Sequence, residues 1–526
     1  MMKTPHRLAA AAALLPLLLG CAAEPPDPFL VRTDAGPVQG FAPQGAADVA
    51  AFLGIPFAQA PEGDLRWRPP QAVEPWTEPR QTGEYRPICP QSRAQLPQSE
   101  DCLYLNVWTS AERSGTNAMP VMVWIHGGGF RAGNGRLGEA PATGRGVGLA
   151  RRGVVVVSIQ YRLAALGFFA HPALAAEAAT SGEPEGSHGV LDMIAALEWV
   201  QRNAAAFGGD PDRVTIFGVS AGGMAVNTLM SAPAAGGLFH RAISESGYGT
   251  WRLPHLSEAR WGLSSARDQG AALIADAFDL GAEPSAADLR ALPVGELINL
   301  GTGFWVPITG TVLPDEPGIV FARGEQQDVP YITGGNSFEG TIFRAFATTP
   351  GDHFATFGDR EGQARALYGA DGETDAEAER IAAATLFGDQ RYVISARYLA
   401  EQMKTVSSPA RTYYFQFVPE AQRETVPGAP HGSEVSYVFG DTGAPDSERY
   451  PGADGEALGD AMAGYWTRFA ATGDPNGDGA PEWPEYDAES DTWMVLDAPE
   501  PKATPGVIKD KLDLLETVYL ERVGGE

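Results

Sequence analysis

One unbroken apolar run limits the folds open to this chain more than any other feature. Residues 154–159 read Val-Val-Val-Val-Ser-Ile, without alternation of polar and apolar side chains. A strand with one face in water alternates, so this run is typical of a central strand covered on both faces. Such strands belong to mostly parallel sheets whose connections are helices. We therefore expect an α/β fold.

The rest of the chain repeats this pattern of short strand-like runs separated by helical spacing. Residues 189–207 form a helical stripe that two glycines end, and residues 256–301 indicate an inserted helical region. No repeat and no convincing linker divides the chain after residue 29. We predict one domain over residues 29–526, with a large, mostly parallel central sheet, helices on both faces and helical insertions. The clearest predicted strands span residues 103–108, 121–125, 154–161, 214–217, 331–333 and 412–418.

The net charge of the chain argues against one class of function, nucleic-acid binding. The 526 residues include 38 Lys and Arg against 66 Asp and Glu, which gives a formal net charge of −28. Nucleic-acid binding needs cations to replace counterions, so this balance argues against it. The composition, with 44% hydrophobic residues, also excludes a disordered chain.

The N-terminus resembles a bacterial export signal. Lys3 and Arg7 precede an apolar run over residues 8–19, too short to span a bilayer but suited to a signal-peptide core. The run ends in Leu-Leu-Gly-Cys21, which resembles the lipobox, where the Cys thiol is lipidated and becomes the new N-terminus. We expect a signal peptide over residues 1–20, a Pro-rich tether over 21–28 and a lipid anchor in the cell envelope. The alternative is a plain secretory signal cut near Ala23, which would leave a soluble secreted or periplasmic protein.

Export bears on the two remaining cysteines. Cys89 and Cys102 can form a disulfide outside the cytoplasm, and the count is then even once Cys21 carries a lipid.

A candidate nucleophile lies where a predicted strand meets a helix of small residues. Residues 214–223 read Val-Thr-Ile-Phe-Gly-Val-Ser-Ala-Gly-Gly, which contains the pattern G-x-S-x-G. The pattern alone is weak in a chain with 63 glycines, but its strand–turn–helix context predicts a nucleophile elbow. Small neighbours at Gly218 and Gly222 allow the tight turn that exposes the oxygen of Ser220.

A serine nucleophile needs a base, and the base needs an orienting acid. In this kind of site the acid and then the histidine follow the serine along the chain. His431 lies in a Pro-His-Gly loop after a predicted strand, where an imidazole can reach the ends of other strands. His240 and His255 leave too little chain for an intervening strand that carries the acid. His353 follows no comparable strand and is predicted to be a surface or packing residue.

Glu339 is the predicted acid. It lies in the segment Gly-Gly-Asn-Ser-Phe-Glu-Gly, directly after the strand at residues 331–333. Asp315 and Asp328 precede that strand and should lie at its wrong end. The alternative for Glu339 is a solvated loop charge.

A glycine triplet completes the predicted chemistry. The strand at residues 121–125 runs into His-Gly-Gly-Gly-Phe, in which N–H groups can turn toward a substrate oxygen without obstruction by Cβ atoms. Together with the N–H of Ala221 they would form an oxyanion hole.

These segments together resemble the type-B carboxylesterase family of α/β-hydrolases, which includes carboxylesterases and cholinesterases. The resemblance covers roughly residues 29–520. Beyond the motifs above, it rests on Ser-Glu-Asp-Cys-Leu-Tyr-Leu-Asn at 99–106, Gln-Tyr-Arg-Leu at 160–163, Gly-Gly-Asp-Pro at 208–211, and the pairs at 339–340, 431–432 and 483–484.

The resemblance implies the α/β-hydrolase fold and a serine carboxylester hydrolase that works through an acyl-enzyme, without a metal or organic cofactor. The residues that it implies are the triad Ser220, Glu339 and His431, the oxyanion donors Gly128, Gly129 and Ala221, and the disulfide Cys89–Cys102. One departure is Thr309, where the family usually has an Asp before Gly310; it lies near the expected substrate region and leaves the triad unaffected.

Two departures from the cholinesterase branch bear on the substrate. Quaternary ammonium groups are bound by aromatic faces. Cholinesterases carry a key Trp between the two disulfide cysteines and an acidic residue before the nucleophile, but residues 90–101 contain no aromatic residue and Val219 precedes Ser220. We expect neutral esters with small or medium acyl groups.

Residues 474–485 fit the spacing of a calcium-binding loop. However, Pro481 and Pro484 fall inside the loop, and a strand-like run follows in place of a helix, so we favour a structural turn.

Two other functions stay open: a non-catalytic adhesion or ligand-binding relative, and a lipase, amidase or thioesterase that uses the same triad. The expected partner is a small ester, with membrane contact only through Cys21, and no oligomeric state follows from the sequence.

Overall fold

A ten-stranded sheet forms the centre of the protein. The computed structural model describes residues 1–2, 27–113, 118–137, 145–301, 304–346, 348–372, 375–440, 453–477 and 479–525. The strands of the sheet are β3 (Val49–Pro56), β5 (Tyr104–Ser110), β6 (Met119–Ile125), β7 (Val155–Ile159), β8 (Gly209–Val219), β9 (Arg241–Glu245), β10 (Tyr331–Asn336), β11 (Ala410–Phe415), β12 (Thr492–Leu496) and β13 (Lys502–Pro505). They lie in the order β13-β12-β11-β10-β9-β8-β6-β7-β5-β3.

The sheet is mostly parallel, as predicted. Every neighbouring pair from β12 through β7 is parallel, and antiparallel pairs occur only at the two ends, at β12–β13, β7–β5 and β5–β3. The six predicted strands are all present with shifted ends. The largest shift is in β8, which begins at Gly209, five residues before the predicted start at residue 214. Gly209 pairs with Met119, and an irregularity in the register takes up the extra residues before Val121 pairs with Val214.

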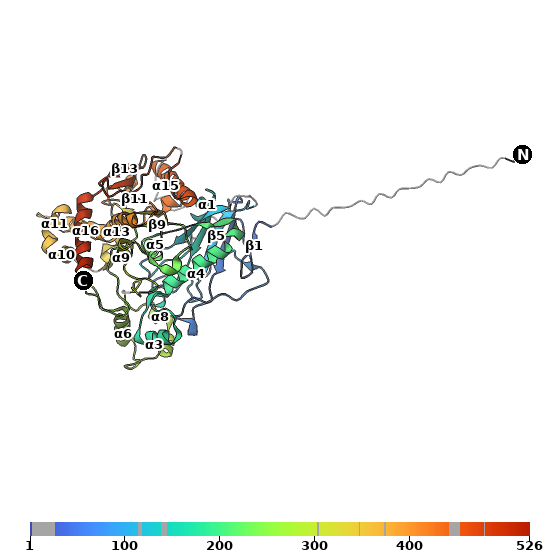
Figure 1. The fold of residues 1–526 in the computed structure, drawn as a ribbon, viewed down its shortest axis with the longest axis horizontal. Helices are drawn as coiled ribbons and strands as arrows, with labels where there is room; N and C mark the ends of the chain where they lie inside the picture. Colours follow the sequence, from blue (N-terminus) through green and yellow to red (C-terminus); the bar gives the residue numbers. More distant parts are fainter. Residues whose placement is uncertain are drawn as a thin grey trace.

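Helices cover both faces of the sheet, and the side chains of β6 show how. Val121, Val123 and Ile125 point into one core with the helices α4 (His188–Asn203) and α5 (Ala221–Ser231). Met122 and Trp124 point into the opposite core with α1 (Arg145–Ala150) and α15 (Ala453–Thr472). In Figure 1, α4 and α5 lie in front of the strands. Burial on both faces explains the unbroken apolar runs.

The inserted helical region predicted at residues 256–301 is present as α6 (Ala266–Ala277), α7 (Ala286–Arg290) and α8 (Val294–Leu297). Helix α3 (Pro172–Ser181) packs against α6 and α7, and this group forms the lower end of the molecule in Figure 1. A small second sheet joins β1 (Leu30–Arg32), β2 (Pro37–Gln39) and β4 (Arg80–Gln81).

The described residues form further helices and shorter helical segments. The α-helices are α2 (Ala164–Phe168), α9 (Pro317–Ala322), α10 (Pro350–Ala355), α11 (Glu361–Leu367), α12 (Ala376–Gly388), α13 (Ile394–Gln402), α14 (Val435–Val438) and α16 (Lys509–Gly524). The short 3₁₀- or π-helical segments are η1 (Gly63–Leu65), η2 (Ala204–Phe207), η3 (Pro233–Ala235), η4 (Glu339–Phe346), η5 (Gly358–Arg360), η6 (Asp389–Val393), η7 (Met403–Thr405) and η8 (Glu420–Gln422). Of these, η6 is a π-helical turn between α12 and α13.

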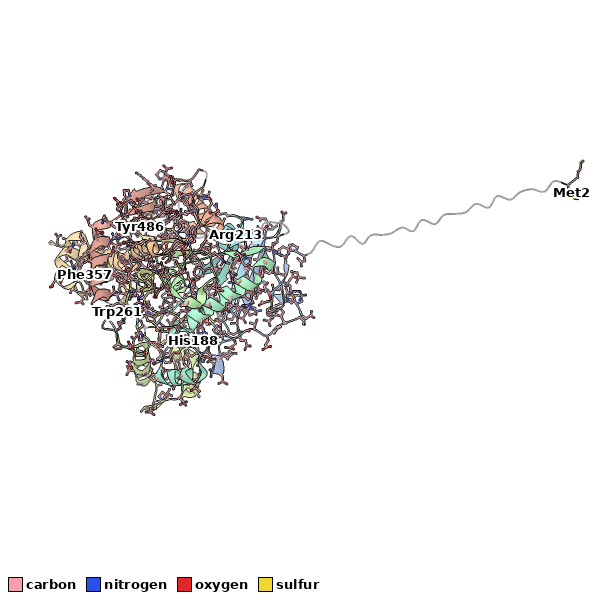
Figure 2. The ribbon with its side chains drawn as sticks, in the orientation of Figure 1. Met2, His188, Arg213, Trp261, Phe357 and Tyr486 are labelled. Carbon is pink, nitrogen blue, oxygen red and sulfur yellow. A yellow bond between two sulfur atoms is a disulfide. The ribbon has the colours of Figure 1, made fainter. Side chains whose placement is uncertain are left out.

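The C-terminal helix α16 packs on η6, α11 and α13 (Figure 1). Arg522 near its end forms an ion pair with the buried Glu316 at 2.6 Å. The Arg522 guanidinium also lies 4.5 Å from the ring centroid of Trp261, and that of Arg260 lies 3.9 Å from the same ring. Trp261 is labelled at the lower left of the molecule in Figure 2. These contacts fix the end of the chain against the helical insertion.

Among the described residues, no helix combines the length and the apolar character needed to cross a bilayer. Cys21 and the apolar run over residues 8–19 lie outside the described residues.

Candidate active site

Ser220 occupies a strained turn between β8 and α5. Its backbone has φ 60° and ψ −120°, a conformation that L-residues rarely adopt outside functional turns. The Ser220 N–H donates to the Glu245 carbonyl at 2.8 Å, and its carbonyl accepts from the Met224 N–H at 2.9 Å, which begins the helix. The backbone is therefore held at both sides of the turn.

The glycines on either side of Ser220 are required by close approach. A Cβ on Gly218 would lie 2.4 Å from the Ile125 carbonyl oxygen, and one on Gly222 would lie 2.0 Å from the same atom. The elbow thus packs directly on the end of β6, where the glycine triplet begins. This contact brings the candidate nucleophile next to the candidate oxyanion loop.

Glu339 and His431 meet although they are far apart in the sequence. The loops that carry them follow the adjacent strands β10 and β11, and Phe338 forms a parallel bridge with Pro430. His431 Nδ1 and the Glu339 carboxylate form a hydrogen bond. Glu339 is fully buried and the His431 side chain is 10% exposed, so the solvated alternative for Glu339 does not hold.

The other ring nitrogen of His431 is directed to the buried side of the site. Within the described part of the chain, His431 Nε2 is buried and makes no hydrogen bond. A Cβ on Gly432 would lie 3.9 Å from the side chain of Val219, so the histidine loop lies beside the elbow. This arrangement leaves Nε2 available for a proton transfer at the elbow.

A second buried acid lies behind Glu339. The Ser246 hydroxyl donates to Glu339 at 2.6 Å and lies 3.3 Å from Glu434 Oε1. Asn336 joins the two carboxylates, since its backbone N–H donates to Glu339 at 2.7 Å and its side-chain amide to Glu434 at 2.5 Å. The network holds Glu339 in one orientation against His431.

The charges in this network shift the pKa values of His431 and Glu434. Burial alone would lower the pKa of His431, but the charge and hydrogen bond of Glu339 outweigh it and raise the pKa above the usual 6.5. Burial, together with repulsion from Glu339, raises the pKa of Glu434 to about 7. Glu434 therefore keeps its proton to a higher pH than an exposed glutamate does.

The oxyanion loop has the backbone that its glycines predict. Gly128 and Gly129 have φ of +114° and +66°. A Cβ on Gly127 would lie 3.2 Å from the Cβ of Ser220, whereas one on Gly129 would meet nothing within 4 Å. The loop thus passes beside the serine and borders open space, while Ala221 provides the first N–H of α5.

Two sets of contacts hold this loop in place, one from the ring of Tyr161 and one from Gln91 in the loop closed by the disulfide. The His126 ring stacks on Tyr161 with centroids 4.3 Å apart, and the Tyr161 hydroxyl donates to the His126 carbonyl at 2.8 Å. Burial lowers the pKa of His126 to about 4, so it is neutral. Gln91 accepts from the Gly133 N–H at 2.9 Å and donates to the Gly133 carbonyl at 2.8 Å.

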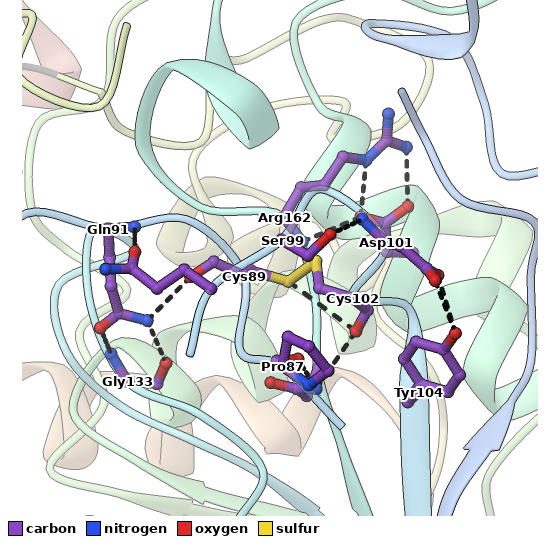
Figure 3. The surroundings of a disulfide bond; sticks show 12 residues. Pro87, Cys89, Gln91, Ser99, Asp101, Cys102, Tyr104, Gly133 and Arg162 are labelled. Carbon is purple, nitrogen blue, oxygen red and sulfur yellow. Dashed lines mark hydrogen bonds and ion pairs between the residues drawn. A yellow bond between two sulfur atoms is a disulfide. The ribbon is translucent and has the colours of Figure 1, made fainter. Parts of the chain in front are cut away.

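Gln91 lies inside the loop closed by Cys89 and Cys102, which are bonded with Cα atoms 5.0 Å apart. Figure 3 shows Gln91 facing Gly133 beside the disulfide. A Cβ on Gly133 would lie 2.4 Å from the ring of His126, so the disulfide loop holds the end of the oxyanion loop in place.

The residues that the sequence set aside have other roles. His353 is buried against Phe343 and Phe387, and burial lowers its pKa to about 4, so it is a packing residue. Asp315 pairs with Arg260 at 2.8 Å, and Asp328 accepts a hydrogen bond from Ser407 at the other end of β10.

An arginine from β11 lies against the acidic residues of the possible calcium-binding loop. Arg411 lies 3.2 Å from Asp474 and 3.5 Å from Glu485. Asp478 lies outside the described residues, and no group of three or more metal-binding side chains occurs among those described.

The sequence reasoning missed Ser246, Asn336, Glu434 and the support from Tyr161. Glu434 follows His431 by three residues and Ser246 directly follows β9, but neither carries a motif of its own. Their roles depend on contacts between segments far apart in the sequence.

The chain is similar in sequence to known proteins over most of its length. The chain matches the carboxylesterase family over residues 27–513. It is 36% identical over 505 residues to the fumonisin B1 esterase of Sphingopyxis macrogoltabida, covering 89% of this chain and 86% of that protein. It is 34% identical over 548 residues to the liver carboxylesterase of Sus scrofa, covering 90% and 92%. It is also 34% identical over 486 residues to carboxylesterase 1C of Mus musculus, covering 84% of each. The fold is that of the α/β-hydrolases, and the chain belongs to the carboxylesterase family of ester-hydrolysing enzymes.

Proposed function

We propose that this enzyme hydrolyses carboxylic esters through Ser220, His431 and Glu339. His431 Nε2 takes the proton of the Ser220 hydroxyl as its oxygen attacks the ester carbonyl. Glu339 orients the imidazole and stabilises its cation. Gly128, Gly129 and Ala221 donate N–H groups to the oxyanion that forms on the carbonyl oxygen.

The second half of the cycle uses the same groups. His431 gives its proton to the alcohol oxygen as the ester bond breaks, which leaves Ser220 acylated. Water then loses a proton to His431 and attacks the acyl-enzyme, and the proton returns to Ser220 as the acid leaves. These steps need no metal and no organic cofactor.

The observation that carries this proposal is the Glu339–His431 hydrogen bond beside a serine in a strained elbow. Ser220→Ala should fold like the wild type, lose about 10⁴-fold or more in kcat, and lose labelling by a fluorophosphonate. The matched control is Ser490→Ala, far from the site in sequence, which should keep both. Retention of most activity in Ser220→Ala would end the proposal.

The substrate class follows from what surrounds the elbow in the sequence. Residues 90–101 offer no aromatic face for a quaternary ammonium group, and Val219 offers no charge for it. We propose a preference for neutral esters with small or medium acyl groups over choline esters.

The location of the enzyme follows from its N-terminal sequence. We propose that residues 1–20 are removed, that Cys21 carries a lipid and that residues 21–28 tether the catalytic domain at 29–526 to the cell envelope. Cys21→Ser should shift the enzyme out of the membrane fraction with its activity kept. An unmodified mature N-terminus beyond Cys21 would favour the plain secretory signal.

A further inference from the structure

A buried arginine lies in an aromatic wall close to the candidate site. Arg391, on the π-helical turn η6, is 1% exposed. Its guanidinium carbon lies 4.2 Å from the ring centroid of Tyr248, 4.5 Å from that of Trp251 and 5.0 Å from that of Trp305. The rings hold the cation through their quadrupoles and fix its position.

The same helical turn contacts the candidate base. Tyr392 packs its ring on His431 with centroids 4.6 Å apart. A π-helical turn adds a residue to a helix and changes the direction of the side chains that follow, and such turns are frequent at functional sites. Here it directs Arg391 and Tyr392 to the ends of the strands that carry the triad.

Tyr248 belongs to the same group of side chains. It follows Ser246 by two residues, and its ring packs edge-on against that of Tyr392, with centroids 5.8 Å apart. Trp251 and Trp305 are only partly buried, so the aromatic wall reaches solvent.

The charge of Arg391 acts within the site. Arg391 is adjacent in the chain to Tyr392, whose ring packs on His431, and its positive charge lowers the pKa of His431. The neighbouring acid Asp389 directs its carboxyl to the Tyr368 hydroxyl at 2.9 Å. In a site of low dielectric, a fixed cation favours a substrate anion and disfavours a substrate cation.

We infer that Arg391 is a specificity-determining residue that favours esters carrying a second, free carboxylate in their acid or alcohol part. This inference rests on the proposed function and deepens it, since neutral esters remain substrates. Arg391 would bring the carboxylate into the aromatic wall while the ester carbonyl lies at Ser220.

The test compares esters that differ only in charge. Monomethyl glutarate and its carboxamide analogue place the charge in the acid part, and the acetate ester of γ-hydroxybutyrate and its carboxamide analogue place it in the alcohol part. Each kcat/KM is divided by the rate of hydrolysis of the same ester by hydroxide. The ratio of carboxylate to carboxamide should be about ten in at least one pair, which corresponds to about 1.4 kcal/mol. It should fall as salt is added.

Substitutions of Arg391 test whether this residue causes the preference for the carboxylate ester. Arg391→Met should lower the ratio to about one, whatever change in rate the two esters share through the pKa of His431, whereas Arg391→Lys should keep a ratio of several-fold. Arg252→Met is the matched control, because Arg252 is an exposed cation next to Trp251 in the sequence, and it should keep the full ratio.

The outcomes separate this inference from the proposed function. Hydrolysis of the carboxamide esters that disappears in Ser220→Ala reports on the triad alone. A wild-type ratio of one or less in both pairs overturns the role of Arg391, as does a full ratio in Arg391→Met. Equal losses on both members of a pair would mark Arg391 as structural. If Arg391→Met does not fold, the wild-type ratio and a reduced ratio in Arg391→Lys decide.

Discussion

Breaking the Cys89–Cys102 disulfide should lower both stability and catalytic rate, because the loop that it closes holds the end of the oxyanion loop. The cysteines are separated by 13 residues. In the chain-entropy model, a bridge over a loop of this size lowers the entropy of the unfolded chain by about 10 cal/mol/K, or about 3 kcal/mol at room temperature. Within the loop, Gln91 makes two hydrogen bonds to Gly133, each worth about 1 kcal/mol. The double variant Cys89→Ser, Cys102→Ser should therefore lose at least about 3 kcal/mol of unfolding free energy.

Equilibrium denaturation in urea, with refolding checked, measures this loss. Gln91→Met is the matched variant, since it keeps the disulfide and removes the side-chain hydrogen bonds to Gly133 and to the Cys89 carbonyl. It should lose about 2 kcal/mol and lower kcat with little change in KM, because oxyanion donors act mainly in the transition state. A double serine variant within about 1 kcal/mol of the wild type would refute the entropic argument. An unchanged kcat in Gln91→Met would refute the link from the disulfide loop to catalysis.

Four further predictions concern the site and its substrate. Protonated His431 cannot accept a proton, and its pKa is raised, so kcat/KM should fall as the pH falls through an inflection above 6.5. Glu434→Gln removes a charge that raises this pKa, so a pH profile should show the inflection at lower pH; an unmoved inflection contradicts the coupling. In Gly222→Ala the new Cβ would lie 2.0 Å from the Ile125 carbonyl oxygen, so the turn that holds Ser220 must shift. A shift of ~1 Å in a reacting group can cost about 100-fold in rate, so we expect kcat to fall at least 100-fold. The control Gly362→Ala, with open space around the new Cβ, should cost little. For a neutral ester and its isosteric choline analogue, kcat/KM should favour the neutral ester; a tenfold preference for choline refutes the substrate class.

The parts of the site that the sequence predicted are those formed by residues close together in the sequence. The elbow at Ser220 and the glycine triplet each combine a strand, a turn and small residues within about ten positions. Glu339 and His431 could be chosen because the carboxyl ends of parallel strands meet at one edge of the sheet. Their hydrogen bond follows from that topology and from the order of the strands.

The parts that could not be predicted depend on contacts made only after folding. Ser246 and Asn336 carry no distinctive motif, and their contacts to Glu434 exist because three loops converge behind Glu339. The π-helical turn that directs Arg391 into the site has no local sequence pattern that separates it from the helices on either side. The early start of β8 at Gly209 was missed because Pro211 indicates a turn, whereas an irregular register keeps this segment in the sheet.

The charges around His431 show why so many groups are buried at one point of the sheet. Glu339 and Glu434 raise the pKa of the imidazole, while burial and Arg391 lower it. A general base works best when its pKa lies near the working pH, because a much higher pKa would leave it protonated and a much lower one would make it a weak acceptor. Removing any one group therefore changes two quantities, the position of His431 and its readiness to take the proton of Ser220. For Arg391 these effects separate experimentally, since its action on His431 is felt equally by charged and uncharged esters. Its action on a substrate carboxylate is felt by one of them alone.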